Sequence, residues 1–221
     1  MSFRTAFQPI IDKPEGKPGV LFYDDNAVII EDKYPKLLRH YLVIPRHATK
    51  THDHPLVAFD DDPEFYTLTK KYVDKCIDLV VSSLLRQFPD ATPDTFRPFI
   101  QVGVHSQPLL SNLHIHVMTR DMWSPAMKHK KHYNSFATPF FVPFARLEPR
   151  ESTDDSDDDN DNNVGGGAAN ADAWLKTGLR CCYCGTDFKN SFVGLKKHLD
   201  KEFRRKYGGL GGDLDDLRPN Q

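Results

Sequence analysis

The sequence predicts an α+β protein, in which helices pack on a sheet of short strands and a small cysteine-containing module follows. Three observations carry this prediction: short alternating apolar runs, one long amphipathic stretch, and three cysteines clustered near the C-terminus. The 221 residues are 39% hydrophobic and 27% charged, which suits one domain of ordinary size plus a small module.

Nothing in the sequence suggests a membrane or secreted protein. No run of about 18 apolar residues occurs, so we expect no transmembrane helix. The first residues, Met1-Ser2-Phe3-Arg4, lack an apolar signal region, so we expect no secretion. The clustered cysteines suit a metal site in a reducing compartment better than a disulfide framework.

Short runs rich in β-branched and aromatic residues, bounded by turn-forming residues, predict the strands. Asp24-Asp25-Asn26 supplies the first turn, and Pro45 ends the third strand. The predicted strands cover residues 20–23, 27–31, 40–44, 99–104 and 112–118.

Three helices are expected in the same part of the chain. A short one, capped by Ser2, runs to about Ile11. A long one spans about 63 to 88, because apolar residues recur there at spacings of three and four; Cys76 on this stripe is expected in the core. Ser124-Pro125 resembles an N-cap followed by a first-turn proline, which predicts a helix through about His132.

Charge is segregated along the chain. Residues 148–172 hold nine acidic residues and one arginine, a balance of −8, so the rest carries −2 − (−8) = +6. The acidic segment cannot bury enough apolar surface to order itself, and we interpret it as a flexible linker. The chain then divides into a domain at 1–147, the linker at 148–172, a module at 173–210 and a tail at 211–221. The basic balance of the ordered parts permits a polyanionic partner.

The stretch from 112 to 118 carries the most informative side chains. Side chains alternate along a strand, so one face is polar and the other apolar. The polar face holds Asn112, His114 and His116, and the apolar face holds Leu113, Ile115 and Val117.

On spacing alone, three interpretations of these histidines remain open. A neutral, metal-free imidazole can attack phosphorus when other donors surround the phosphoryl oxygens. Two histidines one residue apart can also bind a metal, with His105 as a third ligand. They can equally be hydrogen-bonded or surface histidines without a chemical role.

Four segments together carry a family resemblance. They include Asp32-Lys33-Tyr34-Pro35-Lys36 and the basic-aromatic segment 128–136. The full set consists of residues 31–36 leading to 40–45, 103–108, 112–118 and 128–136. The segment 112–118 resembles the histidine-triad (HIT) motif of nucleotide hydrolases and transferases. The whole set, with the C-terminal module, is similar to the aprataxins, the DNA-adenylate hydrolase branch of that superfamily. The resemblance spans nearly all of the chain except the acidic linker.

The resemblance implies a HIT-like domain with a mainly antiparallel sheet, and it implies roles for several residues. His114 matches the histidine that becomes covalently nucleotidylated, and His116 matches the one that helps hold the phosphate. His105 matches a further histidine near the phosphate, and Ser111 could donate from the other side. Asp32 matches the acidic residue that binds the ribose hydroxyls. Lys36 and His40 match positions near the nucleotide, although His40 could instead be structural.

The first motif position is Asn112 instead of histidine. Asparagine cannot protonate a leaving group. The implied leaving group, the 5′-phosphate of DNA, is already a stable anion and needs little protonation. Asn112 therefore argues against phosphoramidate hydrolysis more than against removal of an adenylate, and we expect its amide to orient the site.

Basic residues in two places predict contacts with DNA. A charge run is usually a solvated helix face, but lysines that contact phosphates give sequence-independent affinity. The candidates are Lys128, Lys130, Lys131, His132, Ser135, Lys196 and Lys197. An aromatic side chain could stack on a terminal base, with Phe3, Phe7, Trp123 and Tyr133 as candidates.

The C-terminal cysteines belong to a zinc-finger pattern. Cys181-x2-Cys184 is followed by His198-x3-Glu202, one residue longer than the usual spacing and with a glutamate in place of the last histidine. A carboxylate is an acceptable zinc ligand, and this set resembles that of fungal aprataxins. Four protein ligands leave no open position, so we expect one structural zinc per chain and no catalytic metal. Cys182 could compete as a ligand.

The sequence therefore predicts a nuclear, monomeric DNA-repair hydrolase. It would remove AMP from 5′-adenylated nicked or broken DNA through a histidyl-AMP intermediate, with RNA–DNA junctions as an open possibility, and release AMP without contacting a membrane. Three alternatives remain: a HIT hydrolase of dinucleoside polyphosphates or phosphoramidates, a nucleic-acid-binding adaptor, and a metal-dependent oxygenase.

Overall fold

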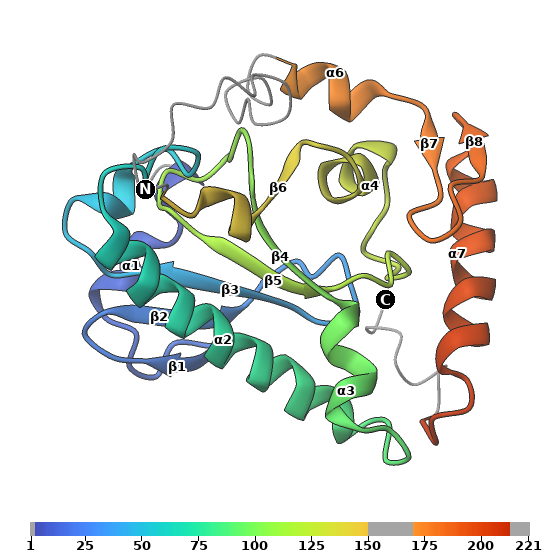
Figure 1. Ribbon diagram of the computed structural model, residues 1–221, viewed down its shortest axis with the longest axis horizontal. Coiled ribbons are helices and arrows are strands. Elements are labelled where there is room, and N and C mark those ends of the chain that lie inside the picture. The colour runs from blue at the N-terminus through green and yellow to red at the C-terminus, as the bar shows by residue number, and fades with distance from the viewer. Residues whose placement is uncertain (1–2, 150–169, 213–221) are drawn as a thin grey trace, which may run out of the picture.

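A computed structural model describes residues 3–149 and 170–212. A six-stranded sheet in the order β1-β2-β3-β5-β4-β6 forms its centre, and every neighbouring pair is antiparallel (Figure 1). The strands are β1 (Val20–Tyr23), β2 (Ala27–Glu31), β3 (His40–Pro45), β4 (Ile100–His105), β5 (Ile115–Thr119) and β6 (Phe141–Pro143). The α+β prediction is confirmed, and β1 and β2 begin and end at the predicted residues.

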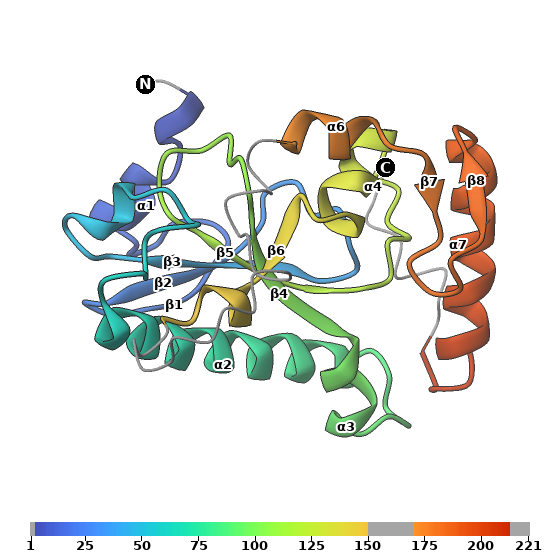
Figure 2. The ribbon, with the colours of Figure 1, turned by 45° about the horizontal axis from the view of Figure 1, so that its top comes forward.

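The long helix α2 (Pro63–Leu85) covers one face of the sheet (Figure 2). The Asp62 carboxylate caps its N-terminus by accepting the Phe65 N–H at 2.8 Å. The helix ends three residues before the predicted position, and Cys76 is fully buried as expected. The sheet residues packed in the same core cluster alternate along their strands and include Ile29, Val43, Ile115 and Val117; Leu113, two residues before β5, joins the same cluster.

The opposite face carries the histidines. A 3-10 helix at Phe3–Thr5, helix α1 (Gln8–Asp12) and helix α4 (Lys130–Ala137) lie on this side (Figure 2). Short 3-10 helices occur at Lys50–His52, Arg97–Phe99 and Phe144–Leu147, and α3 spans Pro93–Phe96. Because His114, His116 and Met118 alternate with the apolar residues facing α2, the period of the strand alone directs the imidazoles to this face.

The predicted helix from 125 to 132 is wrong. The Ser124 hydroxyl accepts the Ala126 N–H at 3.1 Å and the Met127 N–H bonds the Ser124 carbonyl, so the segment makes one turn and stops. His129 is extended, with φ −135° and ψ 150°, and the helix begins at Lys130 instead. The basic run therefore lies across a helix start and is not a continuous helix face.

The C-terminal region forms a small unit of its own elements. Its helix α6 (Ala171–Lys176) begins inside the range predicted as linker. A hairpin of β7 (Leu179–Arg180) and β8 (Asp187–Lys189) precedes α7 (Phe192–Tyr207). The Ser191 hydroxyl caps α7 by accepting the Gly194 N–H at 3.2 Å. Most of the predicted acidic linker and the predicted tail lie outside the described residues.

This unit shares one hydrophobic cluster with the sheet domain. Met118, Met122 and Met127 of the sheet domain pack in a single cluster with Leu179, Leu195 and Leu199. The Trp123 ring stacks on Phe203 at 4.6 Å between centroids, with an interplanar angle of 8°. The finger is therefore held against the domain by apolar packing, in agreement with its place beside the sheet in Figure 1.

Hydrogen bonds fix the same interface. The Tyr133 hydroxyl of α4 donates to the Arg180 carbonyl at 2.7 Å and accepts the Cys182 N–H at 2.9 Å. The Asn134 amide donates to the Thr177 carbonyl at 3.0 Å, and the Tyr183 hydroxyl donates to the Arg120 carbonyl at 2.7 Å.

Across the part of the chain that the structure describes, no helix is both long and apolar enough to cross a bilayer.

Candidate active site and zinc site

His114 has the geometry of a nucleophile. Its Nδ1 lies 2.7 Å from the Asn112 carbonyl oxygen, which can only accept, so Nδ1 carries the proton and Nε2 has a free lone pair. The side chain is 7% exposed, and burial lowers the pKa of His114. His114 is therefore neutral at physiological pH and presents an unprotonated nitrogen. It directly precedes β5, which begins at Ile115.

His116 is linked to His40 by a hydrogen bond. His40 Nε2 and His116 Nδ1 are 2.8 Å apart. The Lys36 N–H points at His40 Nδ1 at 3.5 Å, which favours the tautomer with the proton on Nε2. His40 then donates to His116 Nδ1, and His116 carries its proton on Nε2. This Nε2 is buried and has no partner among the described residues, so a donor is available for a bound oxyanion.

Burial keeps these imidazoles neutral. Burial is the largest cause that lowers the pKa of His40 to about 4, and the Asp32 carboxylate opposes it. Burial also holds the pKa of His116 well below its ordinary value. His40 is thus buried and hydrogen-bonded to His116.

His105 approaches from the neighbouring strand. Its ring centroid lies 4.6 Å from that of His116, and its Nε2 is buried without a partner in the described residues. Burial lowers the pKa of His105 to about 3. Gly103 on the same strand has no side chain because a Cβ there would lie 2.3 Å from the Val142 carbonyl and 2.7 Å from the Phe141 ring. The missing side chain lets β6 and the Phe141 ring close over the imidazoles.

Asp32 and Lys36 lie next to His40. One Asp32 oxygen accepts the Tyr34 N–H at 2.7 Å, and the other lies 3.6 Å from His40 Nε2. The Lys36 ammonium donates to the Tyr34 carbonyl, and burial lowers its pKa. Ligand atoms of Asp32, His40 and His116 lie within 4.8 Å of one another, so this corner also has the donors of a metal site.

The N-terminal segment covers the nucleophile, which sequence reasoning missed. The Phe7 ring meets His114 edge-on at 5.2 Å. The Asn112 amide donates to Gln8 Oε1 at 3.0 Å, and its own Oδ1 is buried without a partner among the described residues. Only long-range packing reveals these contacts, since the segment carries no motif.

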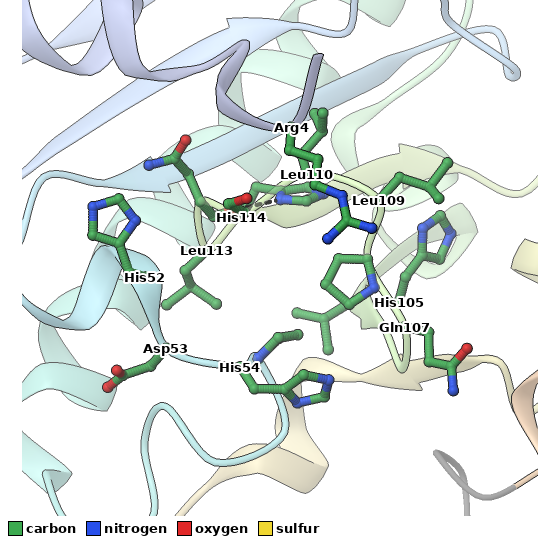
Figure 3. A pocket seen from close by; sticks show the side chains of 15 residues that line it. Arg4, His52, Asp53, His54, His105, Gln107, Leu109, Leu110, Leu113 and His114 are labelled. Carbon is green, nitrogen blue, oxygen red and sulfur yellow. Dashed lines mark hydrogen bonds between the residues drawn. The ribbon is translucent and has the colours of Figure 1, made fainter. Parts of the chain in front are cut away.

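A cavity of about 370 Å³ opens beside His114 (Figure 3). His105, Asn112 and His114 line it together with Ser111. Its other polar lining residues were not predicted: Arg4, His52, Asp53, His54 and Gln107. His52 and His105 lie on opposite sides of the opening in Figure 3. The loop at 51–55 is held there because the Leu113 N–H donates to the Thr51 carbonyl at 2.7 Å.

The predicted DNA contacts divide into exposed and engaged residues. Lys128, Lys131 and Lys197 are exposed. Lys130 donates to the Lys176 carbonyl at 2.9 Å and to Asn190 Oδ1 at 2.6 Å, so it links α4 to the finger. The Ser135 hydroxyl donates to the His132 carbonyl at 2.9 Å, and His132 is partly buried.

Lys196 and two of the predicted stacking residues are used inside the interface. The Lys196 ammonium donates to the Trp123 carbonyl at 2.6 Å and to the Ser124 carbonyl at 2.8 Å, and burial lowers its pKa to about 8. Trp123 is 5% exposed and Tyr133 is 1% exposed, so neither presents a ring face for stacking on DNA. Phe3, at 70% exposed, does.

The finger brings the predicted zinc ligands together. Ligand atoms of Cys181, Cys184 and His198 lie within 4.8 Å of one another, and Cys184 Sγ is 3.2 Å from His198 Nε2. Glu202 Oε1 lies 3.8 Å from that nitrogen. Gly185, with φ +72°, makes the tight turn after the second cysteine. Two thiols, an imidazole and a nearby carboxylate suit a closed tetrahedral zinc site.

Comparisons with known proteins agree with both parts. The model of the scavenger mRNA decapping enzyme C-terminal binding family matches residues 4–132, and that of the C2HE/C2H2/C2HC zinc-binding finger matches 137–205. The aprataxin-like protein of Saccharomyces cerevisiae is 34% identical over 94% of this chain and 99% of its own length. That of Schizosaccharomyces pombe is 31% identical over 91% of this chain and 82% of its own. A crystal structure of the aprataxin orthologue Hnt3 in complex with DNA is 29% identical, covers 95% and 98% of the two chains, and has a TM-score of 0.79.

An antiparallel sheet that brings His114 together with His40, His105 and His116 defines a hydrolase of the histidine-triad type. The finger-family match covers residues 137–205 of this chain. The chain belongs to the aprataxin family.

Proposed function

We propose that this protein removes AMP from 5′-adenylated DNA, through a covalent histidyl-AMP intermediate, and restores a 5′-phosphate end. The observation that carries the proposal is the hydrogen bond from His114 Nδ1–H to the Asn112 carbonyl, which leaves Nε2 free to attack. The membership of the aprataxin family and the DNA complex of the orthologue Hnt3 support the substrate class.

In the first step, His114 Nε2 attacks the phosphorus of the AMP group. A nitrogen–phosphorus bond forms, the pyrophosphate oxygen–phosphorus bond breaks, and the 5′-phosphate strand leaves as an anion. His116 Nε2–H donates to a non-bridging phosphoryl oxygen, and His105 lies beside it in position to donate as well. No acid is required at position 112, because the leaving phosphate is stable without protonation.

In the second step, water attacks the histidyl phosphorus and the nitrogen–phosphorus bond breaks. AMP is released, and His114 is again a neutral imidazole. The water loses its proton to solvent or to the phosphate. The chemistry needs no catalytic metal, because donors already surround the phosphoryl group.

The two halves of the substrate bind on different sides of His114. Asp32 and Lys36 lie beside His40 and are not among the residues that line the cavity, and a carboxylate there suits the vicinal ribose hydroxyls. The cavity, with Arg4 and His52 in its wall, receives the leaving 5′-phosphate strand. Ser111 lines the same cavity and donates to that phosphate.

Exposed basic residues hold the DNA. Lys128, Lys131 and Lys197 contact the backbone of nicked or broken DNA without reading bases, and RNA–DNA junctions are a further substrate to compare with it. Phe3 stacks on the exposed terminal base pair. Glu202 is the fourth ligand of a structural zinc ion, beside Cys181, Cys184 and His198. The protein acts as a monomer in the nucleus.

The decisive test uses nicked DNA labelled in its 5′-adenylate. Wild-type protein quenched in acid-free denaturant should carry label on His114, and His114→Ala should lose the adduct and at least about 1000-fold in deadenylation rate, because the nucleophile is absent. Lys70→Ala, at an exposed site on α2, is the control. A fully active His114→Ala protein would refute the mechanism.

The main alternative is a HIT hydrolase of small dinucleotides or phosphoramidates. Asn112→His restores a group that can protonate an amine. We expect it to raise hydrolysis of adenosine phosphoramidate about 10-fold or more and to leave DNA deadenylation within about 2-fold. Wild-type protein that prefers free dinucleotide to adenylated DNA would favour the alternative.

A further inference from the structure

Phe136 contacts three imidazoles that come from three different strands. It lies in α4 and is 7% exposed. Its ring centroid lies 5.4 Å from His40, 4.9 Å from His105 and 5.8 Å from His116. The rings of His40 and His116 meet it nearly edge-on, with interplanar angles of 89° and 80°. A single apolar side chain thus borders three of the four clustered imidazoles.

The position of this ring is fixed by its surroundings. Phe141 packs beside it at 6.0 Å, in the space that Gly103 leaves open. One turn earlier in α4, Tyr133 and Asn134 are hydrogen-bonded to the backbone of the finger. The helix cannot move away from the histidines without breaking these bonds, so the ring is a rigid boundary.

We propose that Phe136 is a positioning residue: its ring keeps water away from His40, His105 and His116 and holds their relative orientation, so that neutral His116 can donate to the phosphate. The ring touches no substrate in this role and acts only through the imidazoles. The value of the arrangement for the reaction rests on the proposed function, but its effect on the imidazoles does not.

The hydrogen bond between His40 and His116 depends on the exclusion of water, because burial keeps both imidazoles from becoming protonated. It requires one protonated and one bare nitrogen between them, and protonation of both rings would place two N–H groups face to face. Burial is the largest cause that holds the pKa of His40 at about 4 and that of His105 at about 3. The other titratable groups that face the cluster are Asp32, which favours protonation, and Lys36 and His114, which oppose it.

Removal of the ring should admit water. Phe136→Ala opens a space lined by imidazole nitrogens, two of which lack partners among the described residues, and a roomy polar space hydrates. The three pKa values should then rise toward 6.5 by about one unit or more. Phe136→Met keeps an apolar side chain of similar volume and should raise them by less than half of that.

The test is histidine NMR on the full chain without substrate. Imidazole Cε1–H signals are titrated from pH 4 to 8 in wild type, Phe136→Ala and Phe136→Met. The control is Phe59→Ala, a matched loss of a buried ring whose aromatic neighbours are Phe65, Tyr66 and Phe144. We expect the full upward shift in Phe136→Ala, less than half of it in Phe136→Met, and none in Phe59→Ala. Equal pKa values in wild type and Phe136→Ala would overturn the proposal, as would an equal shift in Phe59→Ala. If Phe136→Ala does not fold, Phe136→Val is titrated with the same expected direction.

A second readout connects the ring to the reaction. The rate of histidyl-AMP formation is measured from pH 4 to 8, and the acid limb of the profile should move up by about one unit in Phe136→Ala, so that the loss at pH 4.5 exceeds the loss at pH 8 about 3-fold. A pH-independent loss would overturn the positioning role. If no adduct forms in wild type, the proposed function fails while the NMR result still decides the inference on Phe136.

Discussion

The zinc finger and the histidine cluster are both marked by short motifs, yet they are assembled in opposite ways. The finger ligands lie within 22 residues of sequence, and a tight turn and one helix suffice to bring them together. The histidine cluster takes side chains from β3, β4 and β5 and is bordered by α1 and α4. A local motif predicts its own geometry, whereas a long-range site is predicted only in the residues that carry chemistry.

The largest effect should come from the finger. Cys184→Ala should lose zinc and destabilise the whole chain by about 3 kcal/mol or more, because the finger shares a hydrophobic cluster with the sheet domain. At this chain length, that corresponds to a fall in melting temperature of roughly 2–4 °C per kcal/mol. Calorimetry and zinc analysis measure both.

Cys182→Ala is the matched control for the ligand assignment. The Cys182 backbone N–H is bonded to Tyr133, and its sulfur is absent from the cluster of ligand atoms. We expect it to keep one zinc per chain. Loss of zinc in Cys182→Ala with full retention in Cys184→Ala would exchange the two assignments.

The next effect should come from acid, and it tests the histidine cluster. The pKa of His40 is about 4 when folded and near 6.5 when unfolded, so the unfolded chain binds more protons between these values. The stability that His40 contributes is present above pH 6.5 and is lost as the pH falls toward 4, on the order of 3 kcal/mol. His105 contributes with the same sign.

Denaturant unfolding at pH 4.5, 5.5, 6.5 and 7.5 measures this loss. His40→Gln removes one titrating group and should flatten the dependence in this range. If the wild-type free energy of unfolding were constant from pH 7.5 to 4.5, the imidazoles would have the same pKa values in the folded and unfolded chain. The cluster would then be hydrated, contrary to its burial.

The smallest effect should separate two neighbouring lysines of the finger. Lys196→Met leaves two buried carbonyls without their donor and should cost about 1–3 kcal/mol of stability. Lys197→Met, at an exposed position, should change stability by less than about 0.5 kcal/mol. It should instead weaken DNA binding. The slope of the logarithm of the binding constant against the logarithm of the salt concentration should become shallower by about 0.9, the value for one phosphate contact.

Unfolding and DNA titrations at several salt concentrations distinguish these outcomes. If Lys196→Met lowered the salt dependence of DNA binding and left the free energy of unfolding unchanged, the Lys196 ammonium would contact DNA and not stabilise the interface. If both variants behaved alike, the division of the finger lysines into buried and exposed classes would be wrong.

Sequence alone predicted much of the fold because its strongest signals are local. The strands at 20–23 and 27–31 and the core face of α2 followed from alternation and helical periodicity. The helix expected from Ser124 failed because a serine that caps a helix and one that closes a single turn have the same local sequence. The next residues, Lys128 and His129, have no apolar side chain to hold them in a helix.

The parts of the site that were not predicted are those that depend on distant packing. Gln8 and Phe7 reach Asn112 and His114 from the other end of the domain. Trp123 resembled an exposed stacking residue because its partner Phe203 is 80 residues away in sequence. Lys196 and Lys197 are the same residue type and neighbours in sequence. Only the packing of the finger on the sheet domain shows that the first is bonded inside the interface and the second is exposed.

The shared cluster of methionines and leucines has a consequence for truncation. Met118, Met122 and Met127 are covered by the finger, and a chain that ends after residue 147 would expose them together as one apolar patch. Exposed patches of this kind promote self-association. The catalytic half should therefore aggregate when expressed without its finger, and gene fusions that exchange the finger would need to supply the same apolar contacts.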